Sequence, residues 1–341
     1  MFLEFYGLRE QPFGVTPDPR FLYLSPGHRE ALASLYYGIE AGRGFLGLVA
    51  KPGMGKTTLL FHLLEKFRTT AITAFLFQTQ CDSREFLRYL LTELGCDSKS
   101  QDFVHMHEEF NKRLLREARA GNRFIVVIDE AQNLQPSVLE TVRLLSDFET
   151  TRAKLLHIIL AGQPELGDKL ASAGLSQLRQ RVSLLSGLDP LRPHEIQNYI
   201  DHRLQVGGYE GGPLFTPEAL AVIVDFSEGI PRNVNNFCFN ALSLGCALKQ
   251  KTIDLAIARE VMSDLDVYRH VASAQLCQAK APEGGVAALA KGSAQEKIVA
   301  PSALGALTSL PTPDKKHDMT SAQARDYMLA VVRTLRDWHE A

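Results

Sequence analysis

Cysteine is sparse in this chain of 341 residues, and its spacing argues against the usual cysteine-based sites. The five cysteines are an odd number, are scattered along the chain and form no Cys-x-x-Cys pair. Disulfide frameworks and structural zinc sites both need cysteines paired at characteristic spacings. We therefore expect reduced thiols, without a disulfide framework or a zinc site.

Long hydrophobic runs are also missing. The longest apolar runs, at 124–128 and 155–161, fall far short of the ~18–20 residues that span a bilayer. The first residues lack the basic stretch followed by an apolar one that marks a secretory signal peptide. The sequence therefore predicts a cytoplasmic protein with no membrane span.

An excess of charge of one sign is absent as well. The chain carries 37 basic and 39 acidic residues, for a net charge of -2. No overall positive field attracts nucleic acid, and only a local basic patch would do so. Hydrophobic residues make up 45% and charged residues 22%, close to the averages of soluble globular proteins. The chain can bury a real core, and its length predicts about two domains.

Apolar runs of strand length alternate with amphipathic stretches in the first half of the chain. The runs are continuous, which is typical of strands covered on both faces in a parallel sheet. They lie at 45–50, 71–77, 124–128 and 154–161. Helical patterns lie at 57–68, 83–94, 104–118 and 136–148. This alternation predicts an α/β fold.

The pattern changes after about residue 190. Helical patterns then follow one another, separated by turns rich in Gly and Pro, at 192–206, 217–226, 232–248 and 255–265. Thr216 is a suitable N-cap, and Pro217 suits the first helical position. We expect an α/β core at 1–190 and a small all-helical domain at 191–268.

The last part of the chain has the composition of a linker followed by a helix. From 271 to 319 there is no aromatic residue and no Arg, which is typical of a disordered segment. The apolar residues that follow share one face at helical spacing; they are Tyr327, Val331, Leu335 and Trp338. We expect a disordered linker at 269–319 and an amphipathic helix at 320–341.

A phosphate-binding loop is the strongest motif. The segment Ala50-Lys-Pro-Gly-Met-Gly-Lys-Thr57 follows a predicted strand and opens a predicted helix, the context that a P-loop requires. Lys56 would reach the β- and γ-phosphates, and the Thr57 hydroxyl would ligate Mg²⁺. Ala50 replaces the usual first glycine of the motif. The alternative to a nucleotide-binding loop is an ordinary glycine turn. The predicted nucleotide-binding residues are Pro52, Gly53, Met54, Gly55, Lys56, Thr57 and Thr58.

Two adjacent carboxylates, Asp129 and Glu130, follow another predicted strand. In a nucleotide site Asp129 would hold Mg²⁺, directly or through water, and Glu130 would orient and polarise the attacking water. The alternative is a solvated acidic turn, which the upstream P-loop disfavours. The sequence thus predicts a site for a nucleotide with Mg²⁺.

Further polar residues fit a site that senses the γ-phosphate, each with a structural alternative. Gln163 would contact the γ-phosphate or the water, or else cap the helix that begins at Pro164. Arg179 or Arg181 would act as an arginine finger for a neighbouring subunit, or form a surface salt bridge. Arg232 would lean back onto the γ-phosphate, or only start its helix.

These motifs occur in a characteristic order. It runs through 5–13, 16–25 and 28–32, then D-E-A-Q-N-L at 129–134, L-A-G-Q-P-E-L at 160–166, Gln180-Arg181, and G-I-P-R at 229–232. In sequence and order these segments resemble the AAA+ ATPases of the general secretion pathway protein A type. The resemblance covers residues 1–265, and the same core occurs in the exosortase-associated ATPase and in transposition helper ATPases.

The resemblance implies a five-stranded parallel sheet with an all-helical lid, and ATP bound between them. It also implies that the segment 12–23 lies near the adenine and that the protein forms oligomers. The site residues implied are Lys56 and Thr57 at phosphate and magnesium, Asp129 and Glu130 at magnesium and water, Gln163 as sensor 1, Arg181 as the finger and Arg232 as sensor 2.

Two functions follow as predictions. The first is a cytoplasmic AAA+ ATPase that binds ATP and Mg²⁺, forms homo-oligomers and remodels or recruits a protein partner, such as a secretion or exosortase component. The alternative is an ATP-dependent switch that binds DNA or a transposase and hydrolyses slowly. The charge balance does not favour DNA as the partner.

Overall fold

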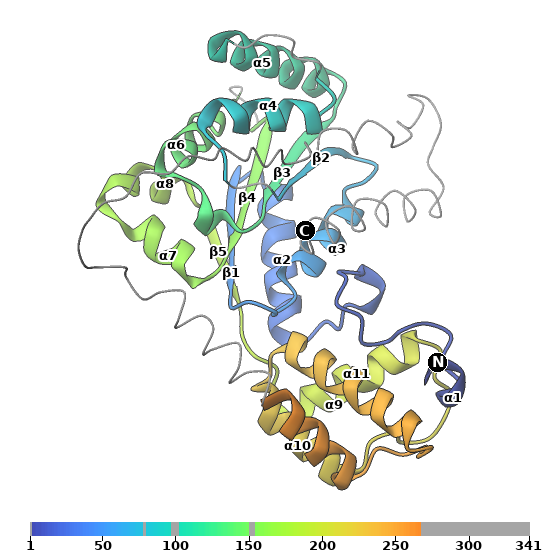
Figure 1. The fold of residues 1–341 in the computed structure, drawn as a ribbon. Helices are drawn as coiled ribbons and strands as arrows, with labels where there is room; N and C mark the ends of the chain where they lie inside the picture. The colour runs from blue at the N-terminus through green and yellow to red at the C-terminus, as the bar shows by residue number, and fades with distance from the viewer. Residues whose placement is uncertain (1, 78–79, 97–101, 150–153, 267–341) are drawn as a thin grey trace, which may run out of the picture. The chain divides into compact units, whose positions relative to one another are not determined.

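The computed structural model describes residues 2–77, 80–96, 102–149 and 154–266, and Figure 1 shows the arrangement of their helices and strands. The predicted linker at 269–319 and the predicted helix at 320–341 lie outside these residues. The described part contains a sheet flanked by helices and, after it in the sequence, a group of helices.

A five-stranded parallel sheet forms the centre of the α/β part, as predicted. Its strand order is β2-β3-β4-β1-β5. The register pairs Val49 with Gly162 and Ile128 with Leu160, so the carboxyl ends of β1, β3 and β4 meet at one edge, where α/β sheets bind ligands. The strands are β1 (Phe45–Ala50), β2 (Ala71–Leu76), β3 (Arg123–Ile128), β4 (Leu156–Gly162) and β5 (Leu184–Leu188).

Helices cover both faces of the sheet, which explains why its central strands are continuously apolar. One face, with Val126 and Ile158, packs against α4 to α8. The other face, with Leu48 and Val127, packs against α2 and α3. These helices are α2 (Pro26–Glu40), α3 (Lys56–Lys66), α4 (Ser83–Glu93), α5 (Phe103–Arg119), α6 (Pro136–Leu145), α7 (Pro164–Ala171) and α8 (Ser176–Arg181).

The helical part, called the lid below, has its own hydrophobic core. It contains α9 (Pro193–Val206), α10 (Pro217–Ser227), α11 (Pro231–Ala247) and a helix over 255–266. Thr216 caps α10 as predicted, because its side chain accepts a hydrogen bond from the amide of Ala219. Ile223, Phe237 and Ile257 meet in this core.

The N-terminal residues pack with the lid. Tyr6, Leu8 and Phe13 are buried in the lid core, and the Tyr6 hydroxyl donates a hydrogen bond to the carbonyl oxygen of Gln250 at 3.1 Å. The helix α1 (Phe2–Tyr6) lies beside α11 (Figure 1). The sequence pattern assigned these residues to the core at 1–190. Their packing partners are instead residues of the lid, far along the chain.

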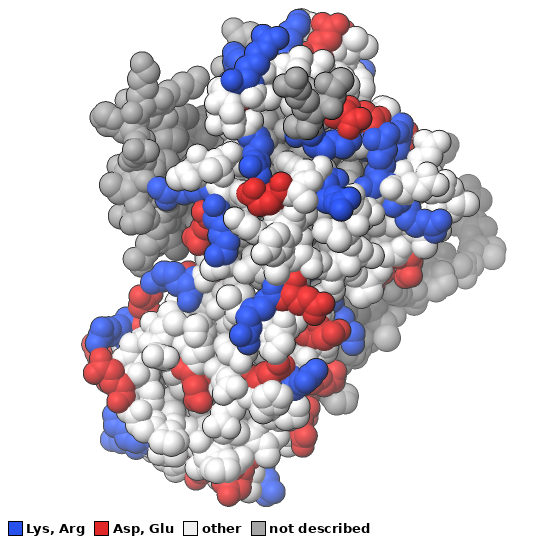
Figure 2. Space-filling view, turned by 180° about the vertical axis from the view of Figure 1, so that it is seen from behind, with Lys and Arg blue, Asp and Glu red and all other residues white. Residues whose placement is uncertain are grey.

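Basic and acidic side chains are mixed on the described surface. Figure 2 shows basic and acidic side chains interspersed over one face of the molecule. No helix in the described ranges combines the length and the hydrophobicity that crossing a bilayer requires.

Candidate functional site

The P-loop connects β1 to α3 at the carboxyl edge of the sheet. Gly53 and Gly55 have φ values of 80° and 86°, in the left-handed region that side chains with a Cβ rarely adopt. Ala50, in contrast, is the last residue of β1 and pairs with Leu188. It lies in an extended strand, so no glycine is needed there. The departure from the usual first glycine leaves the conformation of the loop intact.

Lys56 starts α3 and folds back over the loop. Its Nζ donates a hydrogen bond to the carbonyl oxygen of Ala50 at 3.0 Å, and the side chain is 6% exposed. Burial lowers the pKa of the ammonium group, and the charges of Glu130 and Asp129 partly offset this effect. A cation is thus held close to two carboxylates, where a phosphate group would complete its coordination.

Thr57 and Asp129 join the P-loop to the tip of β3. The Thr57 hydroxyl donates to Oδ2 of Asp129 at 2.6 Å, and the amide of Glu130 donates to Oδ1 at 2.9 Å. Burial raises the pKa of the Asp129 carboxyl, against these two hydrogen bonds, which lower it. A carboxylate and a hydroxyl are the oxygen ligands that Mg²⁺ prefers. This donor set fits a Mg²⁺ ion held by Thr57 and Asp129.

Glu130 lies next to Asp129 in an unusual backbone conformation, with φ 49° and ψ 36°. This left-handed conformation is uncommon for a residue with a side chain and is often found at functional sites. Oε2 of Glu130 accepts hydrogen bonds from Nε2 of Gln163 at 3.0 Å and from Nε2 of Gln132 at 2.5 Å. Gln163 therefore contacts Glu130 rather than capping α7, where its side chain makes no cap hydrogen bond.

Sequence reasoning did not identify Gln132 or His28 as site residues. Gln132 lies within the D-E-A-Q segment, two residues after Glu130. His28 lies in the first turn of α2, and its Nε2 is 3.0 Å from the carbonyl oxygen of Met54. Both residues lie in segments that carry the family resemblance. A glutamine or a histidine at these positions does not by itself indicate a role in the site.

His28 ties the P-loop to the helix that precedes β1. Because the Met54 carbonyl only accepts, Nε2 of His28 carries the proton. Nδ1 then accepts from the Ser25 hydroxyl at 2.8 Å, and that hydroxyl accepts from the His28 amide at 3.3 Å. Burial lowers the pKa of this imidazole, consistent with a neutral ring. This chain of hydrogen bonds fixes the P-loop backbone at Met54.

Arg232 reaches the site through its backbone. Its amide donates to the carbonyl oxygen of Gly53 at 3.1 Å, so the start of α11 contacts the P-loop directly. A Cβ on Gly53 would lie 2.7 Å from Cβ of Arg232. The Arg232 side chain is exposed and its charge lowers the pKa of Lys56. The start of α11 thus lies against the P-loop, and the role of the Arg232 side chain toward the γ-phosphate stays a prediction.

Arg179 and Arg181 lie in α8, which precedes the amino end of β5, whereas the P-loop and the Asp129-Glu130 pair follow the carboxyl ends of β1 and β3. Arg181 forms an ion pair with Asp147, and both side chains are part-exposed. Arg179 is exposed. The salt-bridge alternative therefore describes what Arg181 does within one chain. The role of either arginine at a neighbouring subunit stays a prediction.

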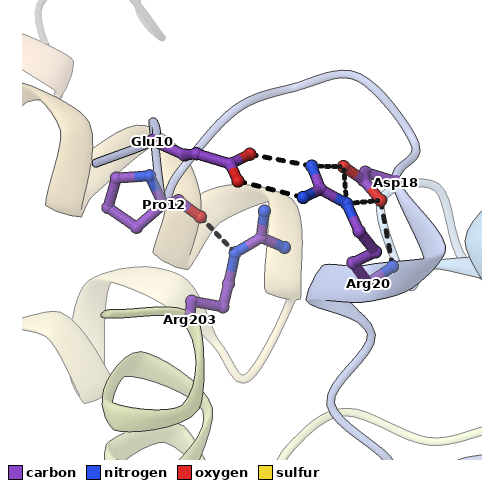
Figure 3. Close-up of polar contacts among 5 residues, drawn as sticks. All are labelled: Glu10, Pro12, Asp18, Arg20 and Arg203. Carbon is purple, nitrogen blue, oxygen red and sulfur yellow. Dashed lines mark hydrogen bonds and ion pairs between the residues drawn. The ribbon is translucent and has the colours of Figure 1, made fainter. Parts of the chain in front are cut away.

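The segment 12–23 contacts the lid helix α9 at Arg203 (Figure 3). Nε of Arg203 donates to the carbonyl oxygen of Pro12 at 2.5 Å, and its guanidinium lies 5.1 Å from the centre of the Phe21 ring. Arg20 lies between two carboxylates, with a bidentate ion pair to Glu10 at 2.8 and 3.0 Å and a second to Asp18. The ion pairs of Arg20 lie within the N-terminal segment, and Arg203 connects this segment to the lid through a hydrogen bond and a contact with the Phe21 ring.

Comparisons with known proteins agree with this geometry. Residues 39–170 match the family model described as AAA domain. The chain is 40% identical over 243 residues to general secretion pathway protein A of Aeromonas hydrophila, covering 71% of this chain and 44% of that protein. It therefore spans less than half of the length of this curated relative.

Solved structures with the same fold are more distant in sequence. The ORC2 protein of Aeropyrum pernix is 15% identical, with a TM-score of 0.60 over 75% of this chain and 72% of that chain. The Cdc6p protein of Pyrobaculum aerophilum is 16% identical, with a TM-score of 0.55 over 71% and 67%. At these identities the likeness concerns the fold alone.

Proposed function

We propose that this chain, an AAA+ P-loop NTPase of the general secretion pathway protein A type, hydrolyses ATP to ADP and phosphate. The observation that carries the proposal is the 2.6 Å contact between the Thr57 hydroxyl and Asp129. It brings the phosphate-binding loop and the acidic end of β3 together, next to Lys56. Phosphoryl transfer needs such a convergence of a cation, a metal site and a base.

Each side chain has a distinct role in this proposal. The P-loop amides and Lys56 bind the β- and γ-phosphates, and Thr57 and Asp129 hold Mg²⁺. The metal would neutralise the charge of the phosphate oxygens. Glu130 orients the attacking water and accepts its proton. Gln163 contacts the γ-phosphate or the water, and Arg232 reports from the lid whether the γ-phosphate is present.

The hydrolytic cycle would drive the assembly or remodelling of a partner complex. The relative from Aeromonas hydrophila is named for the general secretion pathway, and this supports a secretion or export component as the partner. Homo-oligomers are part of the proposal, because Arg181 would complete the site of a neighbouring subunit. Within one chain this arginine precedes the amino end of β5, whereas Lys56 and Glu130 follow the carboxyl ends of β1 and β3.

The test is hydrolysis by the purified chain, measured as phosphate release with Mg²⁺ and ATP. Lys56→Ala should abolish binding of a labelled ATP analogue, because Lys56 is the cation buried beside the loop. The matched control is Lys66→Ala, which removes an exposed lysine at the end of the same helix. Wild-type affinity in Lys56→Ala would contradict the proposed site.

The rate separates the ATPase from the adaptor switch. A rate well below ~0.1 s⁻¹ that no partner stimulates, far under typical enzyme turnover, would support the switch. DNA binding that requires ATP and weakens with salt would support the same alternative. Faster hydrolysis, or stimulation by a protein partner, supports the proposed ATPase.

A further inference from the structure

Three residues at the carboxyl ends of β3 and β4, Glu130, Gln132 and Gln163, form a closed ring of hydrogen bonds. Nε2 of Gln132 donates to Oε2 of Glu130 at 2.5 Å, and Oε1 of Gln132 accepts from the backbone amide of Gln163 at 3.0 Å. Nε2 of Gln163 returns to the same Glu130 oxygen at 3.0 Å. The ring therefore joins the predicted base to the predicted γ-phosphate contact.

The chemistry of the partners fixes the orientation of the Gln132 amide. A backbone N–H only donates, so the atom that faces the Gln163 amide must be the oxygen of Gln132. The nitrogen of the same side chain then points to the Glu130 carboxylate, which accepts. Gln132 thus has two separable functions, one as an acceptor toward Gln163 and one as a donor toward Glu130.

The surrounding backbone is shaped around Gln132. A Cβ on Gly162 would lie 2.7 Å from Oε1 of Gln132, so a glycine is needed for this close approach. Nζ of Lys169, in α7, donates to the carbonyl oxygens of Gln132 at 2.7 Å and of Leu134 at 2.6 Å. The turn that carries Gln132 is held from two sides, and its side chain is positioned rather than free to rotate.

We propose that Gln132 is a positioning residue for hydrolysis, which holds Oε2 of Glu130 through its amide nitrogen. This inference rests on the proposed ATP hydrolysis. Both side-chain amide donors in the ring go to Oε2, which leaves Oε1 of Glu130 to accept a proton from water. If Gln163 turns toward the γ-phosphate when ATP binds, Gln132 is the ring donor that still fixes the carboxylate.

The decisive variant is Gln132→Glu, compared with Gln132→Ala. Glutamate keeps an oxygen that accepts from the Gln163 amide but replaces the donor to Glu130 by a second acceptor. Both variants should lose about 10- to 100-fold in kcat, the range typical of hydrogen-bonding residues that orient metal ligands. The affinity for an ATP analogue should stay close to that of the wild type, because the P-loop is untouched, and the melting temperature checks that each variant is folded.

Gln135→Glu is the matched control. Gln135 lies three residues further along, is exposed and precedes α6 without capping it, so the same new charge there should leave kcat unchanged. If Gln132→Glu has the kcat of the wild type and Gln132→Ala does not, the donor to Glu130 is not needed and the proposal is overturned. The role of Gln132 would then be to accept the hydrogen bond from the Gln163 amide. Wild-type kcat in both variants would also overturn it. A wild-type protein without hydrolysis would overturn this inference together with the proposed function.

Discussion

The backbone amide of Arg232, at the start of α11, donates a hydrogen bond to the carbonyl oxygen of Gly53 in the P-loop at 3.1 Å. The lid and the phosphate-binding loop are therefore in direct contact through main-chain atoms. If the backbone of the P-loop moves when it binds phosphate, the geometry of this hydrogen bond changes, even when the Arg232 side chain does not move. We expect this contact to couple nucleotide binding to the lid.

Gly53→Ala should weaken ATP binding. The added Cβ would lie 2.7 Å from Arg232 at a φ of 80°, and a left-handed conformation costs about 1–2 kcal/mol for a residue with a side chain. A loop that relaxes to avoid this strain must recover its conformation when ATP binds, so the affinity should fall roughly tenfold, measurable with a fluorescent ATP analogue. The control Gly167→Ala adds a Cβ with nothing within 4 Å, inside α7, and should bind ATP like the wild type. Equal affinities in the two variants would contradict the close contact.

Acid should destabilise the protein partly through His157 in β4. Burial, with a contribution from the charge of Arg123, lowers the pKa of this imidazole to about 4, from an ordinary value near 6.5. The unfolded chain binds the proton first as the pH falls, so stability is full above about pH 6.5 and is lost progressively toward pH 4. Between pH 7.5 and 5.0 the expected loss from this residue is about 2 kcal/mol.

Urea unfolding at the two pH values measures this effect. His157→Leu should reduce the difference in unfolding free energy between pH 7.5 and 5.0 by that amount, whatever its effect at a single pH. The control is His105→Leu, at a part-exposed position in α5. An unchanged pH dependence in His157→Leu would show that the imidazole is not held neutral by burial.

Arg181→Ala should bind ATP, stay folded and lose nearly all hydrolysis if Arg181 acts on a neighbouring subunit. An arginine finger contributes ~10³–10⁵ in rate, whereas a part-exposed ion pair such as that with Asp147 contributes about 0–1 kcal/mol of stability. Mixing Arg181→Ala with Lys56→Ala should restore some activity, because the second variant keeps its finger and completes an intact site.

Asp147→Ala separates the finger from the salt bridge. It removes the partner of Arg181 and leaves the guanidinium, so hydrolysis should persist. If Arg181→Ala and Asp147→Ala are equally active, the ion pair is the role of Arg181. If Arg179→Ala is the inactive variant that Lys56→Ala rescues, the finger is Arg179.

Contiguous motifs made the fold and the centre of the site predictable. Lys56 and Thr57 follow directly from a strand, and Asp129 and Glu130 end another, so parallel strand ends bring them to one edge of the sheet. The predicted sheet and the predicted N-cap Thr216 of α10 were both confirmed. Both were predictable because strand patterns and caps depend on residues that are neighbours in the sequence.

The supporting contacts were not predictable, because they depend on tertiary packing. His28 has the ordinary sequence signature of a helix residue, and only the fold brings it to the Met54 carbonyl. Gln132 gains its role from the close approach of Gly162. Arg203 reaches Pro12 across 191 residues of the chain, so no local sequence pattern indicates that the N-terminal segment packs with the lid.

The most direct test of the proposed ATP hydrolysis is a paired measurement of ATP binding and ATP hydrolysis by Glu130→Gln. The amide keeps the shape of the side chain but cannot accept the proton of the attacking water. ATP should bind as in the wild type while hydrolysis falls by ~10²–10⁴, the usual contribution of a general base. The control Glu165→Gln removes an exposed carboxylate whose charge also acts on Lys56, and it should hydrolyse ATP normally. Wild-type hydrolysis by Glu130→Gln would contradict the assignment of Glu130 as the base.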